Sequence, residues 1–135
     1  MPFITESTLS KTFLTRVRLT PDHVGFKFKP TYPEAGPVDQ WKDVTYRQFF
    51  EDCQKVSMGL AELGVHKGDR VVILANTRFE WSVCDIATLG CGAVTVPIYP
   101  SNTELDVEYI LNHCEAKIAI VENSKQLQKI LNIRK

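Results

Sequence analysis

Polar and aromatic side chains stand where two expected strands end, and these are the side chains that could meet a ligand. Asn76 comes directly after the apolar run Arg70–Ala75, and Tyr99, Pro100 and Ser101 stand at the carboxyl end of the next expected strand. Open α/β sheets bind ligands outside the carboxyl ends of their strands. The spacing therefore makes these residues candidates for contact with a ligand.

Asn76 also has an interpretation that needs no ligand. Thr77 with Glu80 three residues later is the pattern of a capping box, in which the Thr hydroxyl and the Glu carboxylate each bind a backbone N–H at the start of a helix. Asn76 would then only end the strand. We favour this interpretation because the capping box accounts for Glu80, and contact of Asn76 and Glu80 with a ligand stays the alternative.

The residue patterns predict no catalytic residue and no metal site. Gly90-Cys91-Gly92 closes an expected helix and opens a strand, whereas a dinucleotide fingerprint follows a strand and opens a helix. His113 and Cys114 are adjacent, so on a helix they point about 100° apart, and no second ligand pair has the spacing of a metal site. The cysteines form no C-x-x-C pair, and we expect buried free thiols at Cys53, Cys84, Cys91 and Cys114.

The elements that must position these residues alternate between strands and helices. A capping box at Thr45 and Gln48 starts a helix of about five turns, and Gly64 is placed to end it. Three strands are expected at Arg70–Ala75, Ala93–Tyr99 and Lys117–Val121. A helix starting at Arg78 separates the first two, a helix starting at Thr103 separates the last two, and a helix capped by Asn123 or Ser124 follows the third. Crossovers between parallel strands are nearly always right-handed. The pattern predicts an α/β fold, with an open, mostly parallel, doubly wound sheet and helices on both faces.

The first part of the chain predicts a smaller arrangement. Thr5–Arg18 has apolar residues at helical spacing, and Val24–Phe28 with Trp41–Val44 predicts a small antiparallel hairpin across the Pro-rich loop Lys29–Gln40. We expect one domain over residues 1–135, in which residues 1–43 form this helix and hairpin and residues 44–135 form the βαβ units.

Composition excludes some classes of function. The chain is 44% hydrophobic and 24% charged, with 16 basic and 16 acidic residues, so it offers no basic surface for nucleic acid. No apolar run approaches the ~20 residues of a membrane span, and no signal peptide is recognisable. We expect a cytoplasmic protein.

Several motifs in a fixed order carry a resemblance to a known family. The stretch from Leu60 to Pro100 reads LAELGVHKGDRVVILANTRFEWSVCDIATLGCGAVTVPIYP, with WKDVTY before it and YILNHCE after it. This order resembles the N-terminal part of the adenylate-forming acyl-CoA synthetases, most closely the long-chain fatty acid CoA ligases. The resemblance covers about residues 41–121.

The resemblance implies that this chain is part of a larger enzyme and cannot carry out the reaction by itself. Such a ligase joins a fatty acid to ATP as an acyl-adenylate with release of diphosphate, and the thiol of CoA then displaces AMP; it requires ATP, Mg²⁺ and CoA. The family's Ser/Thr/Gly-rich phosphate loop and catalytic Lys are not found here. We therefore expect the isolated chain to be inactive, to hold none of these cofactors tightly, and to have the rest of the ligase or a second copy of itself as partner.

The resemblance also gives Tyr99 a specific role to test. In the related acetyl-CoA synthetases, an aromatic residue and two glycines at this turn approach the nucleotide part of CoA. Here Tyr99 is kept, but Pro100 and Ser101 replace the glycines, and proline removes an amide donor. Plain packing of Tyr99 is favoured over this CoA contact. A stand-alone α/β binding or interaction module without ligase activity is the alternative for the whole chain, and the reading frame beyond Lys135 would discriminate the two.

Overall fold

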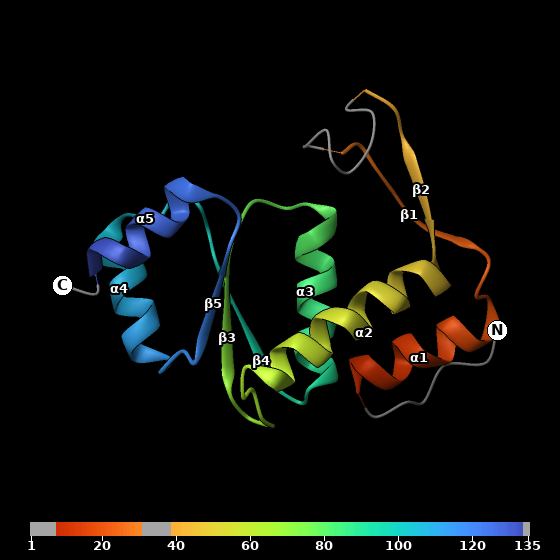
Figure 1. Cartoon of the computed structure of the whole chain (residues 1–135), viewed down its shortest axis with the longest axis horizontal. Helices are drawn as coiled ribbons and strands as arrows, with labels where there is room; N and C mark the ends of the chain where they lie inside the picture. The colour runs from red at the N-terminus through yellow and green to blue at the C-terminus, as the bar shows by residue number, and fades with distance from the viewer. Residues whose placement is uncertain (1–7, 31–38, 134–135) are drawn as a thin grey trace. The chain divides into compact units, whose positions relative to one another are not determined.

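A computed structural model of the chain describes residues 8–30 and 39–133 (Figure 1). The chain forms two compact units, Met1–Lys55 and Val56–Lys135. Thr5 to Ser7 of the first expected helix, and residues 31–38 of the expected loop, lie outside the described residues. The single domain with an internal boundary after residue 43 stays a prediction.

The first unit contains the predicted helix and hairpin. Helix α1 (Leu9–Leu19) begins after Thr8, whose hydroxyl accepts a hydrogen bond from the Lys11 backbone N–H. Strands β1 (Val24–Phe28) and β2 (Lys42–Thr45) pair antiparallel, which confirms the hairpin. The ring of Phe49 is 1% exposed and lies 5.4 Å from the ring of Phe13 and 4.2 Å from that of Phe26, centroid to centroid. Contacts of these rings around the buried Phe49 hold the unit together.

Helix α2 (Tyr46–Glu62) runs from the first unit into the second. Its predicted capping box is confirmed, because Thr45 N–H donates to the Gln48 side chain and Gln48 N–H donates to the Thr45 hydroxyl. Gly64 follows the helix with a φ of 83°, a left-handed conformation that only glycine adopts without strain.

The second unit is a three-stranded parallel sheet with helices between its strands. The order along the chain is β3 (Arg70–Leu74), α3 (Phe79–Gly90), β4 (Val94–Ile98), α4 (Glu104–His113), β5 (Ile118–Val121) and α5 (Ser124–Ile133). In space β3 lies between β4 and β5 and is parallel to both. This topology confirms the predicted fold class, although each strand is one or two residues shorter than expected.

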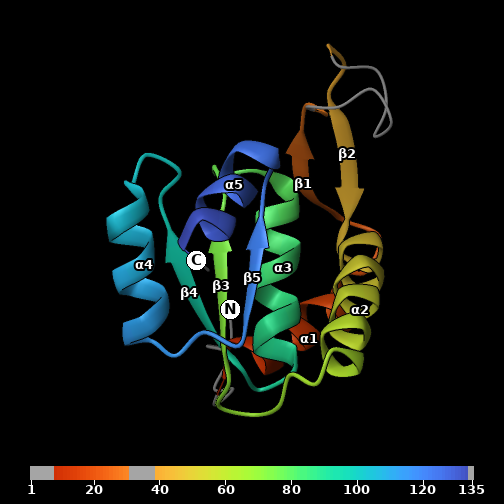
Figure 2. The same cartoon turned by 60° about the vertical axis from the view of Figure 1, so that its left-hand side comes forward.

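The central strand β3 is covered on both faces. Val71 packs with Leu60 and Ala87 in one apolar cluster, while Val72 and Leu74 belong to a second cluster with residues of β4 and α4. Successive strand residues point to opposite faces, so the two clusters lie on opposite sides of the sheet. Helix α3 lies on one side, and α4 and α5 lie on the other (Figures 1 and 2).

The chain leaves two neighbouring strands of the sheet toward opposite faces. The chain leaves β3 for α3 on one face, and it leaves the neighbouring β4 for α4 on the opposite face. Loops that part in this way leave a crevice outside the carboxyl ends of the two strands.

Candidate functional site

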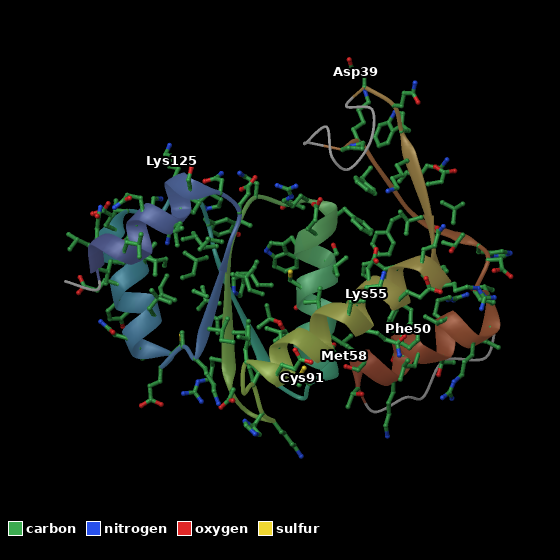
Figure 3. All side chains as sticks on the ribbon, in the orientation of Figure 1. Asp39, Phe50, Lys55, Met58, Cys91 and Lys125 are labelled. Atoms are coloured by element: carbon green, nitrogen blue, oxygen red, sulfur yellow. The ribbon has the colours of Figure 1, made fainter. Side chains whose placement is uncertain are left out.

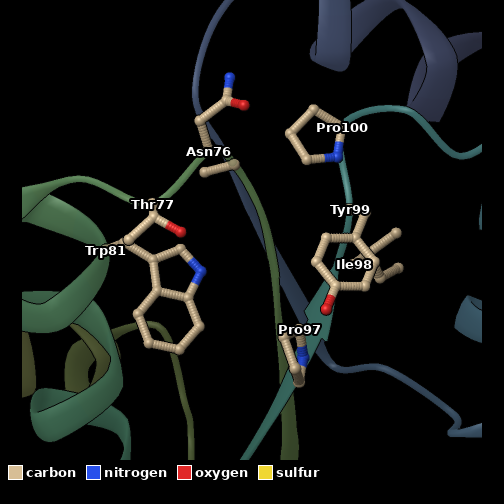
Figure 4. A pocket seen from close by; sticks show the side chains of 8 residues that line it. Asn76, Thr77, Trp81, Pro97, Ile98, Tyr99 and Pro100 are labelled. Carbon is tan, nitrogen blue, oxygen red and sulfur yellow. The ribbon is translucent and has the colours of Figure 1, made fainter.

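A pocket of about 380 Å³ occupies this crevice (Figure 4). Its volume lies in the lower part of the roughly 300–1,000 Å³ that small-molecule sites occupy. Two short walls line it: Ala75, Asn76, Thr77 and Trp81 on the side of β3 and α3, and Pro97, Ile98, Tyr99 and Pro100 on the side of β4. The structure thus brings Asn76, Tyr99 and Pro100 together, while Ser101 is exposed in the following turn and does not line the pocket.

The walls are aromatic and neutral. The Tyr99 side chain is 78% exposed, Trp81 is half-buried, and Ile98 is 3% exposed beneath them. No lining residue carries a charge. Aromatic faces of this kind bind a planar group by stacking, and Asn76 and Thr77 add hydrogen-bonding groups at the rim.

A carboxylate directly after β5 binds Asn76 through two hydrogen bonds. Glu122, the residue after β5, accepts hydrogen bonds at Oε2 from the Asn76 backbone N–H at 2.9 Å and from Asn76 Nδ2 at 2.8 Å. In Figure 4 the Asn76 side-chain oxygen lies on the side of Pro100 and its nitrogen lies away from it. Glu122 accepts one hydrogen of the Asn76 amide nitrogen, and the side-chain oxygen is the acceptor that Asn76 can offer to a ligand.

Arg78 lies between two carboxylates behind this wall. Its Nε is 2.7 Å from Glu80 Oε2 and its Nη1 is 3.4 Å from Glu122 Oε1, and the Arg78 and Glu122 side chains are 12% and 10% exposed. The Asn76 backbone N–H, followed by the Asn76 side chain and Arg78, lowers the pKa of Glu122, against the opposing effect of burial. The Arg78 hydrogen bond lowers the pKa of Glu80 in the same way. The three groups together carry a net negative charge beside the N-terminus of α3, which the helix dipole favours.

The predicted capping box at Thr77 and Glu80 is wrong. Helix α3 has Arg78 as its N-cap residue, with no side-chain capping bond, and Glu80 binds the Arg78 guanidinium. A charged donor next to a carboxylate competes successfully with a neutral backbone N–H. The reason for treating Asn76 as no more than the end of a strand is thereby removed.

The other wall is held by a lysine. The turn after β4 is closed by the Asn102 N–H, which donates to the Tyr99 carbonyl at 3.0 Å. Lys129 of α5 donates from Nζ to the carbonyls of Pro100 and Asn102, at 2.7 Å each. Two carbonyls of the turn are thus satisfied by one half-buried ammonium group.

Sequence reasoning missed Glu122 and Lys129. Glu122 follows the third parallel strand directly, so its position at the same sheet edge as Asn76 could have been deduced from the predicted topology. No local signal identifies Lys129, because its partners lie 27 and 29 residues earlier in the chain.

The remaining chemically capable side chains form no second site in the part of the chain that the structure describes. No group of three His, Cys, Asp or Glu side chains there could hold a metal ion. All four cysteines are free thiols as predicted, but only Cys53 is buried and the others are half-buried. Burial raises the pKa of Cys84, and Glu80 adds to that rise. Among the described helices, none is both long and apolar enough to cross a membrane.

Comparisons with known proteins agree on one family. The model of the family described as AMP-binding enzyme matches residues 13–135. The long-chain-fatty-acid–CoA ligase ACSBG2 of Xenopus laevis is 38% identical over 96 residues, which are 71% of this chain and 13% of that protein. The long-chain-fatty-acid–CoA ligase FadD15 of Mycobacterium bovis is 38% identical over 93 residues, 69% of this chain and 16% of that protein.

A solved structure shows the same fold. The fatty acyl CoA synthetase of Mycobacterium tuberculosis superposes with a TM-score of 0.75 and 24% sequence identity, over 93% of this chain and 23% of that one. The chain therefore spans less than a quarter of the length of each of these proteins.

Proposed function

The chain belongs to the AMP-binding enzyme family, and we propose that it is the N-terminal scaffold portion of an ATP-dependent long-chain fatty acid CoA ligase. The observation that carries the proposal is the match to the two long-chain ligases, each over about 70% of this chain. A parent of this class forms an acyl-adenylate from fatty acid and ATP, with Mg²⁺, and passes the acyl group to the thiol of CoA.

The isolated chain is inactive in this proposal. Stabilising the charge that develops on transferred phosphates takes positioned cations and oriented backbone amides. The sequence has no Ser/Thr/Gly-rich phosphate loop, and the charged side chains at the pocket, Arg78, Glu80 and Glu122, are paired with one another. The chain supplies a rigid wall and leaves the reacting groups to the rest of the ligase.

The pocket fits the adenine base of CoA better than its phosphates. The rings of Tyr99 and Trp81 suit the planar adenine, and the Asn76 oxygen can accept a hydrogen bond from an amino group. The phosphates of CoA need cations, and no lining residue is charged. Tyr99 and Pro100 would hold the base, Ser101 would lie at the approach to it, and the phosphates would be bound by other parts of the parent.

A chimeric ligase tests the function of the whole segment. Residues of this chain would replace the matching segment of the M. bovis ligase FadD15, and we expect the chimera to retain acyl-CoA formation while the chain alone shows none above blank. A chimera carrying Ile73→Asp is the control, because Ile73 is 1% exposed in β3 and an unpaired buried carboxylate should prevent folding. An inactive but folded chimera, or activity of the chain alone, would contradict the proposal.

The role of Tyr99 is tested in the same chimera. Stacking beyond simple burial is worth about 0.5–1.5 kcal/mol, so Tyr99→Ala should raise the KM for CoA several-fold and leave the KM for ATP unchanged. Tyr109→Ala is the matched control, since this tyrosine is also exposed but lies on α4. Equal KM values for CoA in the two variants would assign Tyr99 to plain packing.

A further inference from the structure

We propose that Glu122 and Lys129, neither of which lines the pocket, are positioning residues that hold its two walls from a single segment of the chain. Both lie between the end of β5 and the middle of α5. The ligand named for the pocket rests on the proposed function above, whereas the positioning itself rests on the contacts alone.

The wall after β3 depends on Glu122. Residues 75–78 belong to no helix or strand, so no backbone ladder fixes Asn76. The carboxylate of Glu122 binds both the backbone and the side chain of Asn76 and also faces Arg78, the residue from which α3 starts. The Glu122 backbone N–H meanwhile donates to the Leu74 carbonyl at 3.2 Å, which ties the carboxylate to the last residue of β3.

The wall after β4 depends on Lys129. The turn from Tyr99 to Asn102 has its own closing hydrogen bond, but the carbonyls of Pro100 and Asn102 both turn to α5 and meet the Lys129 ammonium. A second hydrogen bond joins α5 to the start of α4, which follows this turn, because Asn132 Nδ2 donates to Glu104 Oε1 at 2.8 Å. The position of the turn is therefore set by the position of α5.

The segment that carries both residues is itself fixed. Asn123 caps α5 through a hydrogen bond from the Gln126 N–H at 3.1 Å, and Gln126 is 4% exposed. Ile130 and Ile133 of α5 pack on the apolar cluster of Val72 and Leu74. A shift of α5 would therefore move both walls, and loss of either charged group would free only the wall that it holds.

Hydrogen exchange at two backbone amides tests this arrangement in the whole 135-residue chain. The Asn76 N–H reports the first wall and the Asn102 N–H reports the second. Glu122→Ala should speed exchange at Asn76 by about tenfold or more, and Lys129→Met should do the same at Asn102, while each leaves the other wall unchanged. Glu122→Gln keeps one acceptor oxygen and should give a smaller effect. It serves as the second variant if Glu122→Ala does not fold.

Lys125→Met is the matched control for the lysine. Lys125 lies one turn earlier on α5, and its side chain points away from the sheet (Figure 3). The amide of Val72 in the centre of β3 should exchange at the same rate in all variants, which separates a local effect from a general loss of stability. Exchange at Asn76 and Asn102 that matches the Lys125→Met control would overturn the proposal.

Binding of adenosine 3′,5′-bisphosphate, the nucleotide end of CoA, adds a functional readout. In a Trp41→Phe background Trp81 is the only tryptophan and its fluorescence reports the pocket. We expect both variants to weaken binding by about tenfold and Lys125→Met to leave it unchanged. Faster exchange at the two amides in a chain that does not bind the nucleotide would support the positioning role and reject CoA as the ligand.

Discussion

The surroundings of Glu122 lower the pKa of its carboxyl group, and this makes the β3 wall of the pocket sensitive to acid. The Asn76 N–H is the largest influence that holds the pKa of Glu122 below its ordinary value of 4.5. A carboxyl group whose pKa falls on folding adds stability that is complete above the pKa of the unfolded state. That stability is lost as the pH falls through the lower pKa of the folded state.

Glu122→Gln should therefore cost stability at neutral pH and little in acid. We expect a free energy of unfolding lower by about 1–2 kcal/mol at pH 7, since hydrogen bonds to a charged acceptor and the Arg78 pair are weakened. The difference from the natural chain should shrink steadily below about pH 4.5. Urea titrations at pH 7, 5, 4 and 3 measure it, and the exposed Glu62→Gln variant is the control. A difference that stays constant over this range would show that the contacts of Glu122 do not lower its pKa.

At the scale of the elements, the helices differ in how they begin. Helix α4 has a complete capping box: the Thr103 hydroxyl accepts from the Asp106 N–H and the Asp106 carboxylate accepts from the Thr103 N–H. The Thr103 hydroxyl also donates to the Asp106 carboxylate, and this bond, followed by the one from the Thr103 N–H, lowers the pKa of Asp106. Helix α3 has no side-chain cap, because Thr77 stands one residue too early and Arg78 occupies the N-cap position.

The two threonines should therefore respond differently to the same substitution. Thr103→Ala should lower the free energy of unfolding by about 1 kcal/mol, the usual cost of losing an N-cap, and Thr77→Ala should change it by less than about 0.5 kcal/mol. Thermal unfolding followed by circular dichroism compares them under identical conditions. Equal losses would mean that Thr77 caps α3 after all.

These helix starts also show what the sequence can predict. The capping box at Thr45 and the helix start at Thr103 were both predicted from local residue patterns, and both predictions are correct. The capping-box pattern at Thr77 failed because Glu80 binds the guanidinium group of Arg78, which occupies the N-cap position. Glu122, over 40 residues further along the chain, also contacts Arg78. Local rules hold where no charged group competes for the capping groups.

At the scale of the whole molecule, the predicted topology located the candidate site but not the residues that hold its walls. Alternating strands and helices implied a parallel sheet, and the sheet implied that Asn76 and Tyr99 stand at one edge. The pocket confirms that both residues line the same crevice. The contacts of Lys129 depend on how α5 packs across the turn after β4, which no spacing of residue types encodes.

The sheet of the second unit has open edges among the described residues. Strands β4 and β5 each pair only with β3 there, so each has one side without a partner strand. Pro97 in β4 lacks a backbone N–H, and a proline in an edge strand hinders pairing with a further strand. Strand β5, with the sequence IAIV, has neither proline nor charge, so it is the edge more open to pairing.

We therefore expect the chain to associate with itself, through the β5 edge or by exchange of the helix over Asn123–Ile133. Exposed apolar side chains such as Leu105 and Leu127 add surface for contact, and a formal net charge of zero opposes it weakly. Light scattering over a wide concentration range should give a dimer mass or more for the natural chain; a mass that stays at 15.3 kDa up to the highest concentration would refute self-association.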